Sequence, residues 1–208
     1  MKYLKHELLF IFLLINCFIL IKSEDSILKL DTIQNYRTWG WDALVIKNEY
    51  ITVAIVPEMG GNILQYDFGT DTFMLLNSKT FGQKYNVGSL NSPFDGSWGF
   101  GGFETWPSPE AWPPPANLTY RKFTYNLEAC NSDSIVLFLK STKETETFPG
   151  IQFERKISVY NHSTRVKIEN TIINLNSNVV RFGIMNVSYV KVNHENLNDY
   201  DNFLVNFP

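Results

Sequence analysis

The chain is poor in the residues that covalent cross-links and most metal sites require. Its 208 residues include two cysteines and three histidines. No Cys/His cluster has the spacing of a metal site, no glycine-rich loop leads into a helix to hold phosphate, and no nucleophile elbow is present. We therefore predict no metal and no cofactor. The remaining possibilities are chemistry by carboxylates, or binding without chemistry.

Long hydrophobic runs are also scarce. One apolar run, Leu8 to Ile21, spans about 14 residues and is shorter than the roughly 20 that cross a bilayer. Lys2 and Lys5 precede it and Ser23 follows it, the order typical of a secretory signal peptide. We expect a signal peptide over 1–23 and a secreted or secretory-lumen domain over 24–208; an uncleaved anchor is the alternative.

Removal of this leader would leave Cys130 as the only cysteine, so no intramolecular disulfide is expected. The full chain has 18 basic and 21 acidic side chains. The leader contains three of the basic residues and one acidic residue, so residues 24–208 would carry a net charge of −5. This balance argues against nucleic acid as a partner, and against a membrane once the signal is cleaved.

Short runs of aromatic and β-branched residues alternate with turn residues, and no segment keeps a helical apolar period. The domain is therefore predicted to be all-β, a large antiparallel sandwich in one domain. The expected strands are 43–46, 50–56, 62–68, 72–76, 120–128, 134–141, 151–160, 164–175 and 179–192. The segment 78–115 is expected to be an ordered excursion packed across a sheet face.

The segment 98–115 combines three tryptophans, three glycines, five prolines and two glutamates. Stiff aromatic faces beside carboxylates suit a sugar, which offers C–H faces for stacking and hydroxyls for hydrogen bonds. Trp98, Trp106 and Trp112 are candidate stacking platforms, and Glu104 and Glu110 are candidate polar contacts. The alternative is that the same aromatics plug the end of the sandwich.

One predicted strand carries a charge on its apolar face. A period of two over 151–160 places Arg155 with the apolar residues, and Lys156 on the opposite face. A buried guanidinium requires a partner, so Arg155 is either in a structural salt bridge or a ligand contact. Asn170 repeats the pattern on the neighbouring strand, which favours a pocket and makes both residues candidate ligand contacts.

Other residue types support weaker predictions. Three N-x-S/T triplets predict glycosylation sites at Asn117, Asn161 and Asn186. Asp95 could join Glu104 and Glu110 as calcium ligands, but the spacing does not match a dedicated calcium loop. The same two glutamates could also form the carboxylate pair of a glycosidase, although nothing fixes their separation.

Three segments carry a resemblance to a known family. The run Pro57-Glu58-Met59-Gly60-Gly61-Asn62-Ile63 resembles the P-x-x-G-G-R-I signature of galactose-mutarotase-like (aldose 1-epimerase-like) proteins. The run 101–115, GGFETWPSPEAWPPP, is similar to a segment of one branch of that superfamily, the DUF4380 proteins, and 154–157 is similar to its E-R-x-I strand. The resemblance covers roughly residues 36–190.

The resemblance implies an antiparallel β-supersandwich whose concave face binds carbohydrate. It also implies a carboxylate base and histidines that open and reclose a sugar ring. The sequence departs from this pattern, because only His162 and His194 follow the leader and Asn62 replaces the usual arginine. The domains of that superfamily are usually longer, which leaves open whether a chain ending at Pro208 lacks the last strands.

The leading hypothesis is thus a secreted carbohydrate-binding protein of this superfamily. One alternative is an active aldose epimerase with Glu104 or Glu110 as the base. The other is a structural or truncated protein without a ligand.

Overall fold

The structure is a computed structural model that describes residues 28–84, 99–111 and 114–191. These residues form two antiparallel sheets, one short α-helix and three 3₁₀ turns. The prediction of an all-β antiparallel sandwich is therefore confirmed. No helix among the described residues has the length and apolar character needed to cross a membrane.

The larger sheet has strand order β1-β2-β3-β4-β6-β11, with β5 paired to the end of β4. Its strands are β1 Lys29–Ile33, β2 Ala43–Lys47, β3 Ile51–Val56, β4 Asn62–Phe68, β5 Asp71–Thr72, β6 Phe103–Ser108 and β11 Gly183–Ser188. The 3₁₀ turns η1 Tyr36–Thr38, η2 Pro57–Met59 and η3 Ser78–Thr80 lie in its connections.

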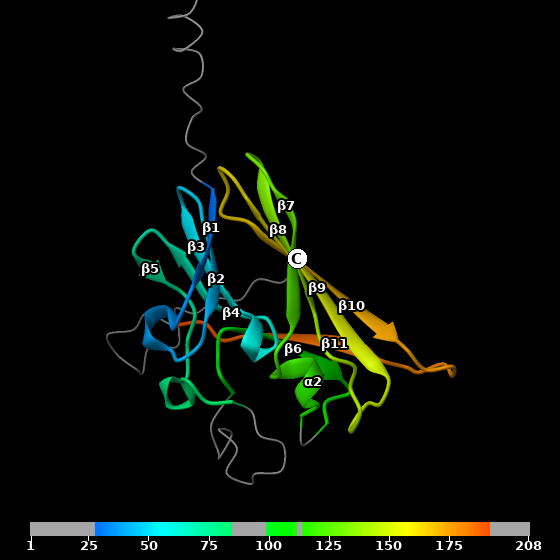
Figure 1. The fold of residues 1–208 in the computed structure, drawn as a ribbon. Coiled ribbons are helices and arrows are strands. Elements are labelled where there is room, and N and C mark those ends of the chain that lie inside the picture. The colour runs from blue at the N-terminus through cyan, green and yellow to red at the C-terminus, as the bar shows by residue number, and fades with distance from the viewer. Residues whose placement is uncertain (1–27, 85–98, 112–113, 192–208) are drawn as a thin grey trace, which may run out of the picture.

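The smaller sheet has strand order β10-β9-β8-β7. Its strands are β7 Thr124–Cys130, β8 Ser134–Lys140, β9 Ile151–Tyr160 and β10 Val166–Asn174. Helix α2, Ala116–Thr119, connects β6 to this sheet. In Figure 1 the blue and cyan strands of the larger sheet lie opposite the green and yellow strands of the smaller one.

The main core fills the space between the sheets. Alternate residues of β8 and β9 point into it, and those of β9 are Ile151, Phe153, Arg155, Ile157 and Val159. Leu44, Ile46, Val53 and Ile55 meet them from β2 and β3. The predicted register of 151–160 is confirmed, because a period of two exposes alternate faces of a strand.

A second core covers the other, outer face of the larger sheet. It contains alternate residues of β2 and β3 together with aromatic residues from β6 and the connections: Ala43, Val45, Ala54, Val56, Trp39, Trp41, Phe100, Trp106 and Tyr120. Strands β2 and β3 are therefore buried on both faces, which explains their nearly continuous apolar runs.

The predicted strands needed five corrections. Strand β6 lies inside the segment expected to be a loop, and β1 was not predicted. In place of the predicted strand 72–76, the structure has the short strand β5 followed by isolated bridges at Met74 and Leu76. In place of the predicted strand 179–192, it has the shorter strand β11. The predicted strand at 120–128 begins later, at Thr124, because Tyr120 caps helix α2.

Strand β6 was not predicted because its segment is rich in proline and glycine, which are typical of loops. Pro107 pairs with Ile184 of β11, whereas β4 meets β6 only at Phe103. Since β6 has a strand partner on one side over most of its length, a missing N–H at Pro107 is tolerated as it is on an edge strand.

Candidate functional site

Trp106 and Glu104 face the second core on β6. Trp106 is 7% exposed, and its ring meets that of Tyr120 edge-on with centroids 5.5 Å apart. Trp106 is therefore a core residue, as expected under the alternative prediction in which these aromatic residues are buried and do not contact a ligand. Trp98 and Trp112, the other two predicted platforms, lie outside the described residues.

The Glu104 carboxylate is buried and surrounded by donors. Its Oε1 accepts hydrogen bonds of 3.1 Å from the N–H groups of Phe100 and Gly101. Its Oε2 accepts hydrogen bonds from Trp106 Nε1 at 3.1 Å and the Tyr120 hydroxyl at 3.4 Å. Burial raises the pKa of Glu104, and these four donors lower it by a smaller amount. The arrangement holds the turn before β6 in place.

Glu110 is exposed beyond the end of β6. The two predicted catalytic glutamates therefore differ in environment, one being enclosed in the second core and the other facing solvent. Asp95 lies outside the described residues, and no group of three metal-ligating side chains occurs among the described ones.

Arg155 and Asn170 are brought together, as their positions on neighbouring strands predicted. They are directly paired across β9 and β10, and Arg155 Nε donates to Asn170 Oδ1 at 2.9 Å. Arg155 Nη1 donates to the backbone oxygens of Gly61 at 2.7 Å and Gly60 at 3.3 Å. Within the described parts of the chain no carboxylate pairs with this guanidinium.

Neutral acceptors thus hold a guanidinium that is 1% exposed. Desolvation lowers the pKa of Arg155 to about 10, so the group remains charged at neutral pH. The contacts tie the smaller sheet to the turn between β3 and β4 in the larger one. Arg155 is therefore a structural bridge, and its partners are carbonyl oxygens instead of the carboxylate of a salt bridge or a ligand, the two alternatives raised by the sequence.

The glycine pair contacted by Arg155 has φ values of 66° at Gly60 and 64° at Gly61. A Cβ at Gly60 would lie 1.9 Å from the Thr119 oxygen, and one at Gly61 would lie 2.8 Å from the Leu139 side chain. Both positions require glycine for conformation and for space. Two of the segments that carried the family resemblance therefore meet in space.

A separate pocket of about 230 Å³ lies on the outer face of the larger sheet, beside the second core. We call it the outer-face pocket, lined by Arg37, Trp39, Leu64, Gln65, Asp67, Thr72, Met74, Leu75, Leu76, Phe81 and Lys191. Its volume is below the roughly 300–1,000 Å³ of sites for drug-sized ligands, which favours a ligand of about one ring.

Two polar side chains of β4 form the buried wall of this pocket. Gln65 is 3% exposed and Asp67 is 6% exposed. Gln65 Nε2 donates to Asp67 Oδ2, and Arg37 Nη2 lies 3.5 Å from the same oxygen. The buried Gln65 Oε1 acceptor has no hydrogen-bond partner among the residues that the structure describes. An unpaired buried acceptor costs about 1–3 kcal/mol, which a ligand hydroxyl would recover.

The backbone that presents Arg37 is strained. Asn35, Arg37 and Thr38 have φ values of 44°, 50° and 60°. Non-glycine residues avoid this left-handed region, at roughly 1–2 kcal/mol each. Hydrogen bonds from Asn35 N to Asp42 Oδ1 and from Gly40 N to Asn35 Oδ1 stabilise the turn. Strain of this kind clusters at functional sites.

Lys191 and Thr72 complete the polar rim. Lys191 Nζ donates to Thr72 Oγ1 at 2.7 Å, and Lys191 N donates to the Phe73 oxygen at 2.7 Å. Apolar side chains, including Trp39 and Phe81, form the remainder of the lining. The pocket thus combines aromatic and aliphatic walls with both charges and an amide.

Sequence reasoning did not identify these residues. A register shift between Ala54 and Ile55 pairs Ile63 with Ile55 and Gln65 with Ala54. Ile63 consequently faces the main core, while Gln65 and Asp67 face the outer side. In a strand without a bulge, these three alternate positions would face the same side. A bulge reverses the side-chain alternation, so a period of two fails there. Polar residues within an apolar strand were the available signal.

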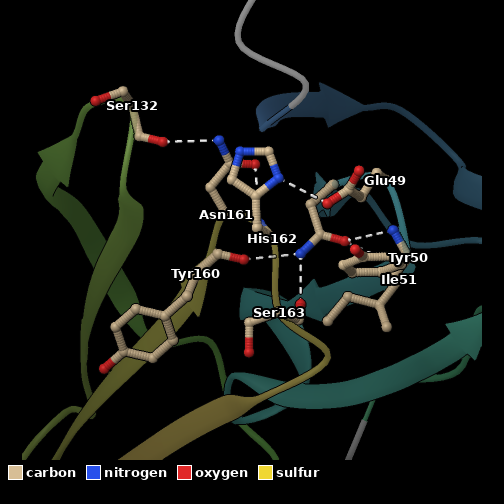
Figure 2. A network of polar contacts seen from close by, with 9 residues as sticks. Glu49, Tyr50, Ile51, Ser132, Tyr160, Asn161, His162 and Ser163 are labelled. Carbon is tan, nitrogen blue, oxygen red and sulfur yellow. Dashed lines mark hydrogen bonds and ion pairs between the residues drawn. The ribbon is translucent and has the colours of Figure 1, made fainter.

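His162 lies in the turn between β9 and β10, where its ring faces Glu49 (Figure 2). It is exposed, and its Nδ1 lies 2.7 Å from Glu49 Oε1 in the turn between β2 and β3. The neighbouring Asn48 Nδ2 donates to the backbone oxygens of Tyr160 and Ser163, both at 2.7 Å. These contacts join the two sheets at their hairpin turns. His194 lies outside the described residues.

The three predicted glycosylation sites differ in exposure. Asn117 is 5% exposed, and its Nδ2 donates to the Lys143 oxygen at 3.0 Å. Asn161 is half-buried in a turn, and Asn186 is exposed on β11. The Asn186 Oδ1 accepts hydrogen bonds from Asn170 Nδ2 at 3.1 Å and Thr105 Oγ1 at 3.2 Å.

No protein-family model matches the chain, and searches of curated proteins and of solved structures find no match.

Proposed function

We propose that the chain is a secreted, galactose-mutarotase-like β-sandwich protein that binds carbohydrate in the outer-face pocket, with no catalytic step assigned. The proposal keeps the ligand class expected from the sequence but moves its site. Trp106 and Glu104 support the second core, and Arg155 and Asn170 join the two sheets. Their structural roles leave the outer face of the larger sheet as the surface for a ligand.

The observation that carries the proposal is that Gln65, one of the residues lining the pocket, has a buried Oε1 with no hydrogen-bond partner among the described residues. An amide oxygen that lies beside a paired carboxylate and guanidinium suits a ligand with several hydroxyls, which can donate and accept at once. The apolar lining suits the C–H faces of a sugar ring. The left-handed turn at Arg37 supports the same site independently.

A second hollow, of about 530 Å³, lies near Phe148 and Phe182 at the ends of several strands. Those two rings pack edge-on with centroids 4.8 Å apart, and the Asn176 amide there donates to the Pro149 oxygen. This hollow is larger but offers fewer buried polar groups, so the outer-face pocket is the better sugar site. Binding at the second hollow would contradict our placement.

Binding can be tested with Gln65→Met, which retains the size of the side chain and removes its amide. We expect wild-type protein to bind at least one member of a panel of mono- and oligosaccharides, measured by NMR titration. Gln65→Met should weaken that binding about tenfold, as expected for losing a hydrogen bond in a desolvated site. Gln34→Met, at an exposed position, is the control and should leave binding unchanged.

Failure of the whole panel to bind folded wild-type protein would refute the proposal. The rival sugar epimerase predicts in addition that anomer exchange is accelerated, which NMR exchange spectroscopy measures on the same samples. We expect no acceleration, because Glu104 is held by four donors outside the outer-face pocket.

A further inference from the structure

The charges of the outer-face pocket do not balance. Arg37 and Lys191 contribute two positive charges, and Asp67 contributes one negative charge. The Arg37 guanidinium and the Asp67 carboxylate pair with one another at 3.5 Å. Lys191 Nζ donates a hydrogen bond to the uncharged Thr72 hydroxyl. This ammonium forms no ion pair with any described carboxylate.

The position of Lys191 is fixed by the fold. Its N–H donates to the Phe73 oxygen, and Leu75 N donates to the Tyr189 oxygen, so two segments run side by side at the pocket rim. The isolated bridge between Met74 and Val190 belongs to the same pairing. Lys191 is thus held exposed at the rim of the pocket, whose lining also includes the apolar side chains of Met74 and Leu76.

From this arrangement we infer that the pocket prefers a sugar that carries a carboxylate, a uronic acid, over its neutral counterpart. The Gln65 Oε1 acceptor requires a hydroxyl donor, and the Lys191 ammonium provides a site for an anion. A uronic acid has both groups on a single ring. A hydrogen-bonded ion pair between a carboxylate and the Lys191 ammonium would be stronger than the hydrogen bond that this ammonium makes with the uncharged Thr72 hydroxyl. The inference rests on the proposed function, since it concerns the same pocket.

The test compares methyl glucuronide with methyl glucoside, and methyl galacturonide with methyl galactoside, by NMR titration at low ionic strength. Wild-type protein should bind the acidic member of at least one pair about tenfold more tightly. Lys191→Met should make the two members equal, while Lys29→Met, a change at an exposed position in β1, should preserve the preference. Raising the salt concentration should weaken the binding of the acidic sugar selectively.

The outcomes separate the inference from the proposed function. Equal affinity for acidic and neutral sugars would refute the inference and leave carbohydrate binding intact. A preference that survives in Lys191→Met, or that salt does not reduce, would also refute it. No binding of either sugar class in these pairs or in the wider panel would refute both. If Lys191→Met alters the structure of the pocket rim, the salt dependence of binding to the wild-type protein still tests whether the preference for the acidic sugar is electrostatic.

Discussion

Arg155 Nε donates to Asn170 Oδ1 over 2.9 Å, directly across the pairing of β9 and β10. The same guanidinium reaches the backbone oxygens of Gly60 and Gly61 in the opposite sheet. A single buried cation thus connects the two layers of the sandwich. The sequence indicated its burial and its nearness to Asn170, but not its carbonyl partners in the opposite sheet.

Replacing this cation should destabilise the fold. Arg155→Leu would leave the Asn170 amide and two carbonyls without their donor, at about 1–3 kcal/mol for each buried unsatisfied group. We expect a loss of about 2–5 kcal/mol in the free energy of unfolding, measured by urea denaturation.

Lys156→Leu is the matched control, because Lys156 points the opposite way and pairs with Glu128 in a partly exposed ion pair. Ion pairs at exposed positions contribute little to stability, so this variant should lose much less than Arg155→Leu. Similar losses in both variants would contradict the assignment of Arg155 as the bridge.

The buried Glu104 carboxyl predicts a pH dependence of stability. Its pKa is raised in the folded protein, so the folded state binds this proton more tightly than the unfolded state does. The contribution of Glu104 is full below the ordinary carboxyl pKa of about 4.3 and declines as pH rises through the folded pKa. As pH increases from the ordinary carboxyl pKa through the raised pKa of the folded state, wild-type protein should therefore lose stability relative to Glu104→Gln.

Thermal unfolding of the two proteins across this pH range provides the comparison. A difference that stays constant, or that moves in favour of wild type as pH rises, would indicate that the donors to Glu104 outweigh its burial.

The exposed Glu49 carboxyl should have the opposite trend. Its hydrogen bond with His162 lowers the pKa of Glu49 in the folded state. The stabilising contribution is present above the ordinary carboxyl pKa and is lost as pH falls through the lowered value. Glu49→Gln should remove that part of the acid sensitivity. Unchanged acid unfolding in the variant would mean that the contact in Figure 2 does not persist in solution.

Most of the fold could be predicted from the sequence, because its strands follow a period of two and end at turn residues. The prediction of β9 succeeded to the residue, since its apolar alternation has no bulge. Strand β6 was hidden by Pro107, and the outer-face pocket was hidden by the register shift opposite Ala54. Both depend on which strands become neighbours, and local sequence does not specify that.

The site could be predicted only in part for the same reason. Arg155 and Asn170 were recognised as unusual core residues, but whether such a pair forms a pocket or a bridge depends on the approach of the Gly60 turn. Lys191 and Gln65 come from segments far apart in the chain, and only the folded sheet brings them together.

Glycosylation should discriminate among the three asparagines. When the protein is secreted from eukaryotic cells, we expect a glycan on Asn161, which lies in a turn, and none on Asn117. The Asn117 side chain is buried against the Lys143 backbone and has no space for a glycan in the folded domain. Peptide mapping by mass spectrometry measures the occupancy of each site. A fully occupied Asn117 in folded protein would contradict the packing around α2.

The central claim is that the outer-face pocket binds a sugar, and an NMR titration of ¹⁵N-labelled wild-type protein with a panel of sugars tests it most directly. We predict that the Gln65 side-chain amide and the backbone signals of Arg37, Thr72 and Lys191 shift together and saturate with one affinity. Signals that shift instead around Phe148 and Phe182, or that do not shift with any sugar, would contradict the claim.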